Sequence, residues 1–265
     1  MHFIHINDKN NIFLDLIQEK VNLSKLLVII PTYNEIENIE AITAEVLGLS
    51  NEYNVLVVDD GSPDGTGAKV KSLMDKYNGR LHLLERKGKL GLGTAYIAGF
   101  KYALERDFDF VMEMDADFSH NPKDVAALVE GCKLPGVGMA VGSRYIKGGG
   151  FRNWSKYRLI LSYGASIYTR IITWMPVKDA TAGFVVYNRE VLEKMDLSKI
   201  KFVGYAFQIE MKYYCHSLGY KIKEVPIVFV DRELGTSKMD SSIISEAILG
   251  VLQMRLRDYS AKNTK

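Results

Sequence analysis

From Leu26 onward, short apolar runs alternate with amphipathic stretches. Four of these runs are bounded by turn or acidic residues and have the length of buried strands: 26–30, 54–58, 110–114 and 138–142. Between them, apolar positions at helical spacing predict helices over 35–47, 64–77, 93–105 and 121–132. This alternation predicts an α/β fold with a mostly parallel central sheet flanked by helices.

A second region follows the glycine run at 148–150. Its pattern predicts a helix over 155–174, a strand over 184–187, a helix over 205–218, a strand over 222–230 and a last amphipathic helix over 241–257. We expect an appendage at 1–25 with one helix over 12–23, a main domain at 26–240 that includes a helix at 153–175, and a C-terminal helix and tail at 241–265.

Composition narrows the class of protein. The 265 residues hold 34 Lys and Arg against 32 Asp and Glu, a net charge of +2, with 47% hydrophobic and 25% charged residues. These values are typical of a globular protein and exclude a disordered chain, a collagen, a coiled coil and a wholly basic nucleic-acid binder. Two cysteines make no disulfide framework, which favours a reducing, cytoplasmic compartment. No secretory signal and no apolar run of about 18 residues is present, so we expect the protein to be soluble or peripheral to a membrane.

Two predicted strands run directly into aspartates. Asp59 and Asp60 follow one strand, and Asp115 and Asp117 follow another. Residues i and i+2 of an extended chain share a face, and two close carboxylates favour a hard divalent cation between them. His120 lies close enough in sequence to order this loop or to join the metal. Neither the P-loop nor the G-x-G-x-x-G phosphate motif is present, which argues against ATPases and NAD-dependent dehydrogenases.

Several motifs together resemble those of a known family. They are PTYNE at 31–35, VVDDGSPDGT at 57–66, GLGTAY at 91–96, DADFSHNP at 115–122, GSRY at 142–145, NWSKYRLILSYGAS at 153–166, DATAGF at 179–184 and REL-GTSK at 232–238. The pattern resembles dolichol-phosphate (polyprenyl-phosphate) mannosyltransferases, which are inverting glycosyltransferases of the GT-A fold. The earlier motifs occur in many glycosyltransferases, whereas the later ones are more specific to polyprenyl-phosphate acceptors.

The resemblance implies roles for individual residues. Asp117 is the main ligand for Mg²⁺ or Mn²⁺, and Ser119 stands where some relatives carry a glutamine in the metal shell. Arg144, Arg158 and Ser162 match positions around the acceptor phosphate, and the residues implied in catalysis are Asp115, Asp117, Arg144 and Arg232. The residues implied in binding the donor nucleotide are Pro31, Tyr33, Glu35, Val58, Asp60, Asp115, Ala116, Asp117, Arg232 and Lys238.

The segment from Arg144 to Lys178 independently favours an anionic partner. It holds seven Lys or Arg and no acidic residue, interleaved with apolar and aromatic side chains such as Trp154, Tyr157 and Tyr163. Such a helix suits a membrane interface, with basic residues toward phosphates and aromatic residues toward lipid. The alternative is a core helix with a solvated basic face. No RNA-binding module accompanies the segment, so we expect no nucleic-acid partner.

The resemblance implies transfer of mannose from GDP-mannose to dolichyl or polyprenyl phosphate, with inversion, at the cytoplasmic face of a membrane. Whether a separate membrane-anchoring subunit recruits the chain stays open. One alternative is a family member that uses UDP-glucose or another acceptor. Another is a non-catalytic module that binds sugar nucleotides or membrane surfaces.

Overall fold

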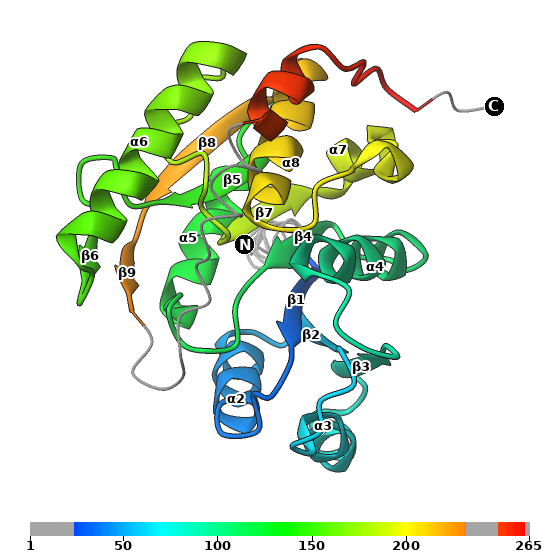
Figure 1. Ribbon diagram of the computed structural model, residues 1–265. Helices are drawn as coiled ribbons and strands as arrows, with labels where there is room; N and C mark the ends of the chain where they lie inside the picture. Colours follow the sequence, from blue (N-terminus) through cyan, green and yellow to red (C-terminus); the bar gives the residue numbers. More distant parts are fainter. Residues whose placement is uncertain (1–23, 232–248, 263–265) are drawn as a thin grey trace, which may run out of the picture.

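The computed structural model describes residues 24–231 and 249–262, and its centre is one seven-stranded sheet (Figure 1). The strand order is β3-β2-β1-β4-β7-β5-β8, and a separate two-stranded sheet pairs β6 with β9. The strands are β1 (Leu26–Thr32), β2 (Tyr53–Asp59), β3 (Leu81–Glu85), β4 (Phe110–Glu113), β5 (Val137–Ser143), β6 (Gly150–Arg152), β7 (Val185–Asn188), β8 (Lys221–Pro226) and β9 (Val228–Val230).

Helices cover both faces of the central sheet. One face packs against α2 (Ile39–Leu49), α3 (Thr66–Met74) and α5 (Val125–Cys132), and the other against α4 (Leu92–Leu104), α7 (Arg189–Lys194) and α8 (Tyr205–Ser217). Alternate β1 residues supply the two cores: Leu27 and Ile29 face α4 and α8, whereas Val28 and Ile30 face α2 and α5. The remaining elements are α6 (Lys156–Thr173) and the 3₁₀ turns Asp75–Tyr77, Pro122–Asp124 and Leu197–Lys199.

The α/β class and the mostly parallel sheet are confirmed. All central pairings are parallel except those of β7, which runs antiparallel to both β4 and β5. Since β7 is antiparallel to both of its neighbours, β4 and β5 run parallel to each other. The carboxyl ends of β1, β2, β4 and β5 therefore meet at one edge of the sheet. The segment that enters β7 begins at that same edge.

The element boundaries differ from the sequence prediction in several places. The pattern missed β3, β6 and α7, and the single strand expected over 222–230 is two strands, β8 and β9, with different partners. Residues 249–255 are helical, in agreement with the described part of the last predicted helix. The helix predicted over 12–23 lies outside the described residues, and the domain boundaries stay predictions.

No described helix is long and apolar enough to cross a bilayer. Helix α6 nevertheless lies on the outside of the molecule, beside β6 (Figure 1), and many of its large apolar side chains are exposed. Its N-cap is Ser155, whose hydroxyl accepts a hydrogen bond from the main-chain N–H of Arg158 at 3.3 Å.

Glycine at position 93 lets α4 pack closely against α8. A Cβ at this position would lie 2.7 Å from the Phe207 ring and 2.9 Å from the Phe202 carbonyl oxygen, which is too close for any real side chain. We expect Gly93→Ala to lower the free energy of unfolding by about 1–3 kcal/mol through overpacking. Gly164→Ala in α6, where a Cβ meets nothing within 4 Å, is the control and should raise it by up to about 1 kcal/mol. Urea denaturation measures both, and equal stabilities for the two variants would contradict this account.

Candidate active site

The two adjacent aspartates after β2 have different surroundings. Asp59 accepts hydrogen bonds from the hydroxyl of Thr32 at 2.9 Å and from the main-chain N–H of Ser62 at 2.9 Å, so it holds the following turn in place. Asp60 instead forms a bidentate ion pair with Arg86, whose two nitrogens lie 2.6 and 2.8 Å from its carboxylate oxygens. Asp60, the proposed nucleotide contact, is therefore fixed in orientation.

Arg86 is a site residue that the sequence pattern did not reveal. It directly follows β3, a strand the pattern missed, and it also donates to the Thr94 hydroxyl at 2.8 Å. Thr94 in turn donates to the Gly91 carbonyl oxygen at 2.7 Å. Arg86 thus ties the GLGTAY motif to the aspartates after β2.

The other proposed nucleotide residues gather around the end of β1. Pro31 lies opposite Val58 in the parallel register, and the Val58 side chain is fully buried, so only the Val58 main chain is open to the nucleotide contact predicted for this residue. The ring of Tyr33 lies 5.2 Å from the Lys89 ammonium. Glu35 begins the segment that leads into α2.

Glu35 is held by its neighbours on both sides. Its main-chain N–H donates to the Thr66 hydroxyl at 3.1 Å, and its carboxylate accepts from the Asn38 amide at 3.1 Å. The start of α2 and the start of α3 are therefore joined at the same edge of the sheet as Asp60.

The loop after β4 presents the second acidic pair. Asp115 has a side chain that is 41% exposed, and Asp117 accepts a hydrogen bond from the main-chain N–H of Ser119 at 3.0 Å. Phe118, between Asp117 and Ser119, adopts a left-handed backbone with φ of 59°. This conformation is uncommon for a bulky residue and makes the chain turn sharply. Ala116 is buried, at 4% exposure. Strain of this kind clusters at ligand-binding loops.

His120 orders this loop from inside the protein. Its side chain is 3% exposed, its Nδ1 accepts from the main-chain N–H of Asp115 at 3.4 Å, and its ring stacks on Phe184 at 4.7 Å. Burial lowers the pKa of His120 to about 4, so the ring is neutral at physiological pH. These contacts favour the loop-ordering role over metal ligation.

The acidic loop fits a small hard cation that also binds substrate. Among residues 24–231 and 249–262, no group of three or more His, Cys, Asp or Glu side chains is arranged to hold a metal by itself. Mg²⁺ and Mn²⁺ sites that serve nucleotides commonly use one or two carboxylates, with substrate phosphates and water completing the shell. Asp115 and Asp117 supply such a donor set. Ser119, at 3% exposure, is more enclosed, and its carbonyl oxygen accepts from the Val230 N–H at 3.2 Å.

Arg144, at the end of β5, is part of a buried ion pair. Its guanidinium donates to both oxygens of Asp179, at 2.7 and 2.6 Å, and its main-chain N–H donates to the same carboxylate at 2.9 Å. It also donates to the Thr181 hydroxyl at 3.0 Å, and that hydroxyl lies 3.3 Å from the hydroxyl of Ser162. Two of the proposed acceptor residues, Arg144 and Ser162, therefore meet at one threonine.

Arg158, on α6, lies close to the same aromatic ring as Arg144. Its guanidinium is 4.7 Å from the centre of the Trp154 ring, and that of Arg144 is 5.1 Å from the same ring. Arg158 also donates to both carboxylate oxygens of Asp231, at 2.8 and 2.9 Å. Asp231 is the last described residue before Arg232. Arg232 and Lys238 themselves lie outside the described residues.

The acidic loop and the arginines share one edge of the molecule. Arg144 follows β5 and Asp115 follows β4, and these parallel strands end on the same side. Val230 of β9 bonds Ser119, and Asp231 bonds both the Arg152 carbonyl oxygen and the Arg158 guanidinium. Strand β9 and the residue that follows it therefore connect the acidic loop to Arg158.

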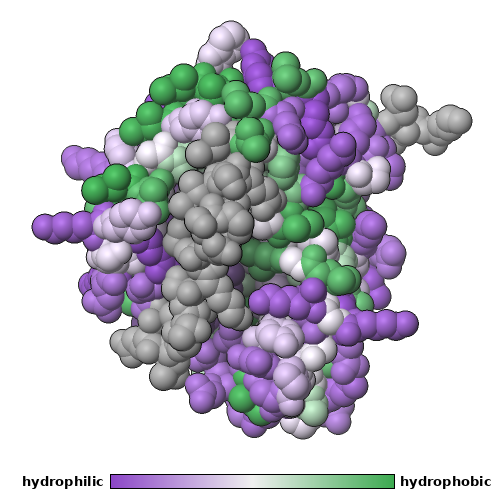
Figure 2. Space-filling model, in the orientation of Figure 1, coloured by the Kyte–Doolittle hydropathy of each residue, from purple (hydrophilic) through white to green (hydrophobic). Residues whose placement is uncertain are grey.

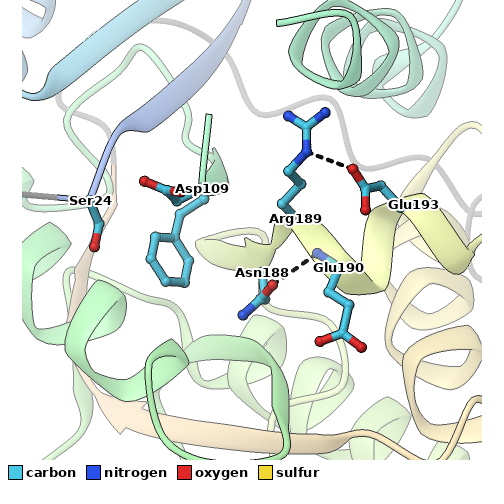
Figure 3. A pocket seen from close by; sticks show the side chains of 7 residues that line it. Ser24, Asp109, Asn188, Arg189, Glu190 and Glu193 are labelled. Atoms are coloured by element: carbon cyan, nitrogen blue, oxygen red, sulfur yellow. Dashed lines mark hydrogen bonds and ion pairs between the residues drawn. The ribbon is translucent and has the colours of Figure 1, made fainter. Parts of the chain in front are cut away.

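A cavity elsewhere is unrelated to this arrangement. It has a volume of about 370 Å³ and lies at the amino end of β4, on the opposite edge of the sheet (Figure 3). Its lining includes Asp109, Asn188 and Glu190, and Arg189 is paired there with Glu193 at 2.6 Å. None of the predicted site residues lines it.

Comparison with protein families identifies the family of this chain. The family model described as glycosyl transferase family 2 matches residues 27–196, which contain the acidic strand ends and the Arg144–Asp179 pair. This chain is a family 2 glycosyltransferase. The family 2 chain is 46% identical over 233 residues to the polyprenol monophosphomannose synthase of Mycolicibacterium smegmatis, covering 88% of each protein. It is 43% identical over 234 residues to the undecaprenyl-phosphate mannosyltransferase of Micrococcus luteus, covering 88% of this chain and 94% of the relative.

Solved structures support the fold of this family 2 glycosyltransferase. Glucosyl-3-phosphoglycerate synthase from Mycobacterium tuberculosis, in complex with Mn²⁺ and UDP-glucose, superimposes with a TM-score of 0.65 at 18% identity. The superposition covers 91% of this chain and 82% of that one. At this identity the similarity confirms the GT-A fold and nothing finer.

Proposed function

We propose that this chain transfers mannose from GDP-mannose to polyprenyl or dolichyl phosphate, with inversion and with the help of Mg²⁺ or Mn²⁺. The observation that carries the proposal is the shared edge on which the acidic loop at 115–117 and the two arginines around Trp154 lie. The acidic loop, with a divalent cation, suits the nucleoside diphosphate of the donor. The two arginines suit an anionic acceptor. The names of the two relatives, both over 40% identical, support this substrate class.

The acceptor requires little activation. A phosphate monoester has a second pKa of about 6, so its oxygen is already mostly anionic near pH 7 and no strong general base is needed. Asp117 would hold the divalent cation, which would offset the negative charge that develops on the departing nucleoside diphosphate. Arg144 and Arg158 hold the acceptor phosphate, and Asp179 keeps the Arg144 guanidinium oriented. Arg232 and Lys238 bind the donor diphosphate.

The proposed acceptor is a lipid, and α6 offers a surface that suits a membrane. The exposed fractions are 71% for Tyr157, 69% for Ile160, 65% for Ile171 and 74% for Trp174. Figure 2 shows apolar side chains along the upper left of the molecule, over α6, with hydrophilic ones between them. This combination of apolar and basic side chains favours the interface of an anionic membrane. We therefore propose peripheral association with the cytoplasmic face of a membrane, with or without an anchoring subunit.

Membrane binding can be tested apart from catalysis. Ile160→Glu replaces an exposed apolar side chain with a charge, and we expect binding to vesicles that contain anionic lipid to fall about tenfold, through lost apolar burial and added repulsion. Leu134→Glu is the control, because Leu134 is 46% exposed but belongs to the connection between α5 and β5 and not to α6. Vesicle co-sedimentation measures both, and equal binding by the two variants would argue for a merely solvated helix.

The decisive experiment incubates the purified protein with labelled GDP-mannose, polyprenyl phosphate and Mg²⁺ or Mn²⁺, with UDP-glucose in parallel. We expect butanol-extractable label from GDP-mannose, and we expect chelation to abolish it. Label from UDP-glucose alone would keep the site but replace the donor. Nucleotide binding with neither transfer nor donor hydrolysis would instead indicate a non-catalytic binding module.

A further inference from the structure

A chain of buried polar side chains lies behind the proposed site. Glu113, the last residue of β4, is 0% exposed and accepts hydrogen bonds from the Tyr187 hydroxyl at 2.7 Å and from the Gln208 amide. Lys212, one helical turn after Gln208 on α8, is also 0% exposed. Its ammonium donates to the Gln208 side-chain oxygen at 3.4 Å and to the Ala182 carbonyl oxygen at 2.6 Å.

The two charges define the orientation of the amide between them. The Gln208 NH₂ group faces the Glu113 carboxylate, and the Gln208 side-chain oxygen faces the Lys212 ammonium. In the reverse orientation the NH₂ group would face the ammonium, a second donor, and the oxygen would face the carboxylate, a second acceptor. Burial raises the pKa of Glu113 and lowers the pKa of Lys212, because a buried position disfavours the charged form of each group. An apolar core of the same volume would avoid this cost.

The two ends of this chain lie on the two halves of the site. Glu113 is two residues before Asp115, and it therefore belongs to the strand that carries the acidic loop. Ala182 belongs to the segment 179–184, in which Asp179 orients Arg144 and Thr181 contacts both Arg144 and Ser162. The hydrogen bonds through Gln208 thus link the donor half to the acceptor half from inside the protein.

We propose that Gln208 and Lys212 are positioning residues that hold the acceptor segment 179–184 in register with the acidic loop after β4. The inference rests on the proposed transfer reaction and adds residues that do not touch substrate. When the Lys212 ammonium is removed, the Ala182 carbonyl loses this donor. The segment 179–184 keeps the ion pair of Asp179 with Arg144 but loses its link to Gln208 and Glu113, so its position relative to the acidic loop is less tightly fixed. The acidic loop keeps its own contacts to His120 and Ser119.

This role predicts a separation of two rates. The first is sugar transfer to polyprenyl phosphate, and the second is metal-dependent hydrolysis of the sugar nucleotide by water without acceptor. For Lys212→Met we expect kcat/KM for the acceptor to fall about tenfold or more, because small misplacements are costly in group transfer. Donor hydrolysis and the KM for the donor should stay within about twofold of wild type. A purely structural role would lower both rates together.

Two further variants keep the test decisive. Tyr214→Phe, on the same helix, is the matched control. In the wild-type protein the Tyr214 hydroxyl accepts from the Asp196 N–H at 2.8 Å and donates to the Ser260 carbonyl oxygen at 2.9 Å, away from the site. The variant should lower the melting temperature without changing the ratio of transfer to hydrolysis. Lys212→Met leaves the Glu113 carboxylate buried without the balancing ammonium, so we expect it to lower the melting temperature. The double variant Glu113→Gln/Lys212→Met removes both buried charges. We expect its melting temperature to return toward that of wild type, while its ratio of transfer to hydrolysis stays low.

The outcomes separate the two proposals. If the wild-type protein transfers sugar and the Lys212→Met ratio equals that of wild type, the positioning role is wrong and the proposed function stands. A ratio that recovers together with stability in the double variant also overturns it, since charge balance alone would then explain the effect. A wild-type protein that hydrolyses donor but transfers nothing to polyprenyl phosphate contradicts the proposed acceptor instead.

Discussion

Asp117→Asn should lower kcat for sugar transfer about a thousandfold, because it removes the charge proposed to hold the divalent cation opposite the departing diphosphate. The fold should survive, since an asparagine oxygen can still accept the hydrogen bond that the Ser119 N–H donates to Asp117 at 3.0 Å. The measurements are labelled-lipid formation at saturating metal, Mn²⁺ binding by titration calorimetry, and the melting temperature.

The chain contains a close structural match for this substitution. Asp196 accepts from the Ser198 N–H at 3.1 Å, in the same Asp-x-Ser arrangement, but it lies before the 3₁₀ turn Leu197–Lys199 and away from the acidic loop. Asp196→Asn should therefore keep its activity and its Mn²⁺ affinity. Substantial transfer by Asp117→Asn would refute the assignment of Asp117 as the main metal ligand.

Asp179→Asn should cause the largest loss of stability among the proposed substitutions. Arg144 is 8% exposed and Asp179 is 0% exposed, so the variant leaves a buried guanidinium without the carboxylate that balances it. Removing one partner of a buried ion pair costs about 3–5 kcal/mol, and we expect the free energy of unfolding in urea to fall by that amount. Transfer should fall as well, because Arg144 loses its fixed orientation.

An exposed ion pair provides the comparison. Arg189 and Glu193 lie 2.6 Å apart, with side chains 31% and 51% exposed, and such pairs contribute little to stability. Glu193→Gln should unfold close to the wild-type midpoint with full transfer activity. If Asp179→Asn were equally stable, Arg144 would not depend on Asp179 for its burial, and its orientation would need another explanation.

The pattern of the sequence predicted the strands that carry the acidic loops but not every element around them. The run 26–30 is continuous and apolar, and the run 110–114 is apolar except for Glu113, because both faces of these strands are buried. Strand β3 has the sequence LHLLE and lies at the sheet edge with most of its residues half-buried, so it lacks such a run. The direction of β7 was also unpredictable, because an apolar run has the same pattern in both orientations.

The partners of the site residues were the harder part. Asp60 and Arg86 are 26 residues apart, and Arg144 and Asp179 are 35 apart. Hydrophobic periodicity shows which face of an element is buried, but it does not show which distant side chain meets it. The proposed ligands therefore came from motifs, whereas Arg86 and Lys212 came only from the tertiary structure. Asp179 belongs to the DATAGF motif, but its pairing with Arg144 also came only from the tertiary structure.

The position of β7 also affects how the protein is made. Among the described strands, β5 pairs only with β7 and β8, and β4 has only β1 beside it until β7 arrives. A ribosome adds about 5–20 residues per second, so the growing chain exposes an apolar sheet edge for seconds after Glu113 has emerged and before Val185 is made. Substitutions that slow the docking of β7 should therefore reduce the yield of soluble protein in the cell, even when they leave the finished enzyme as active as wild type.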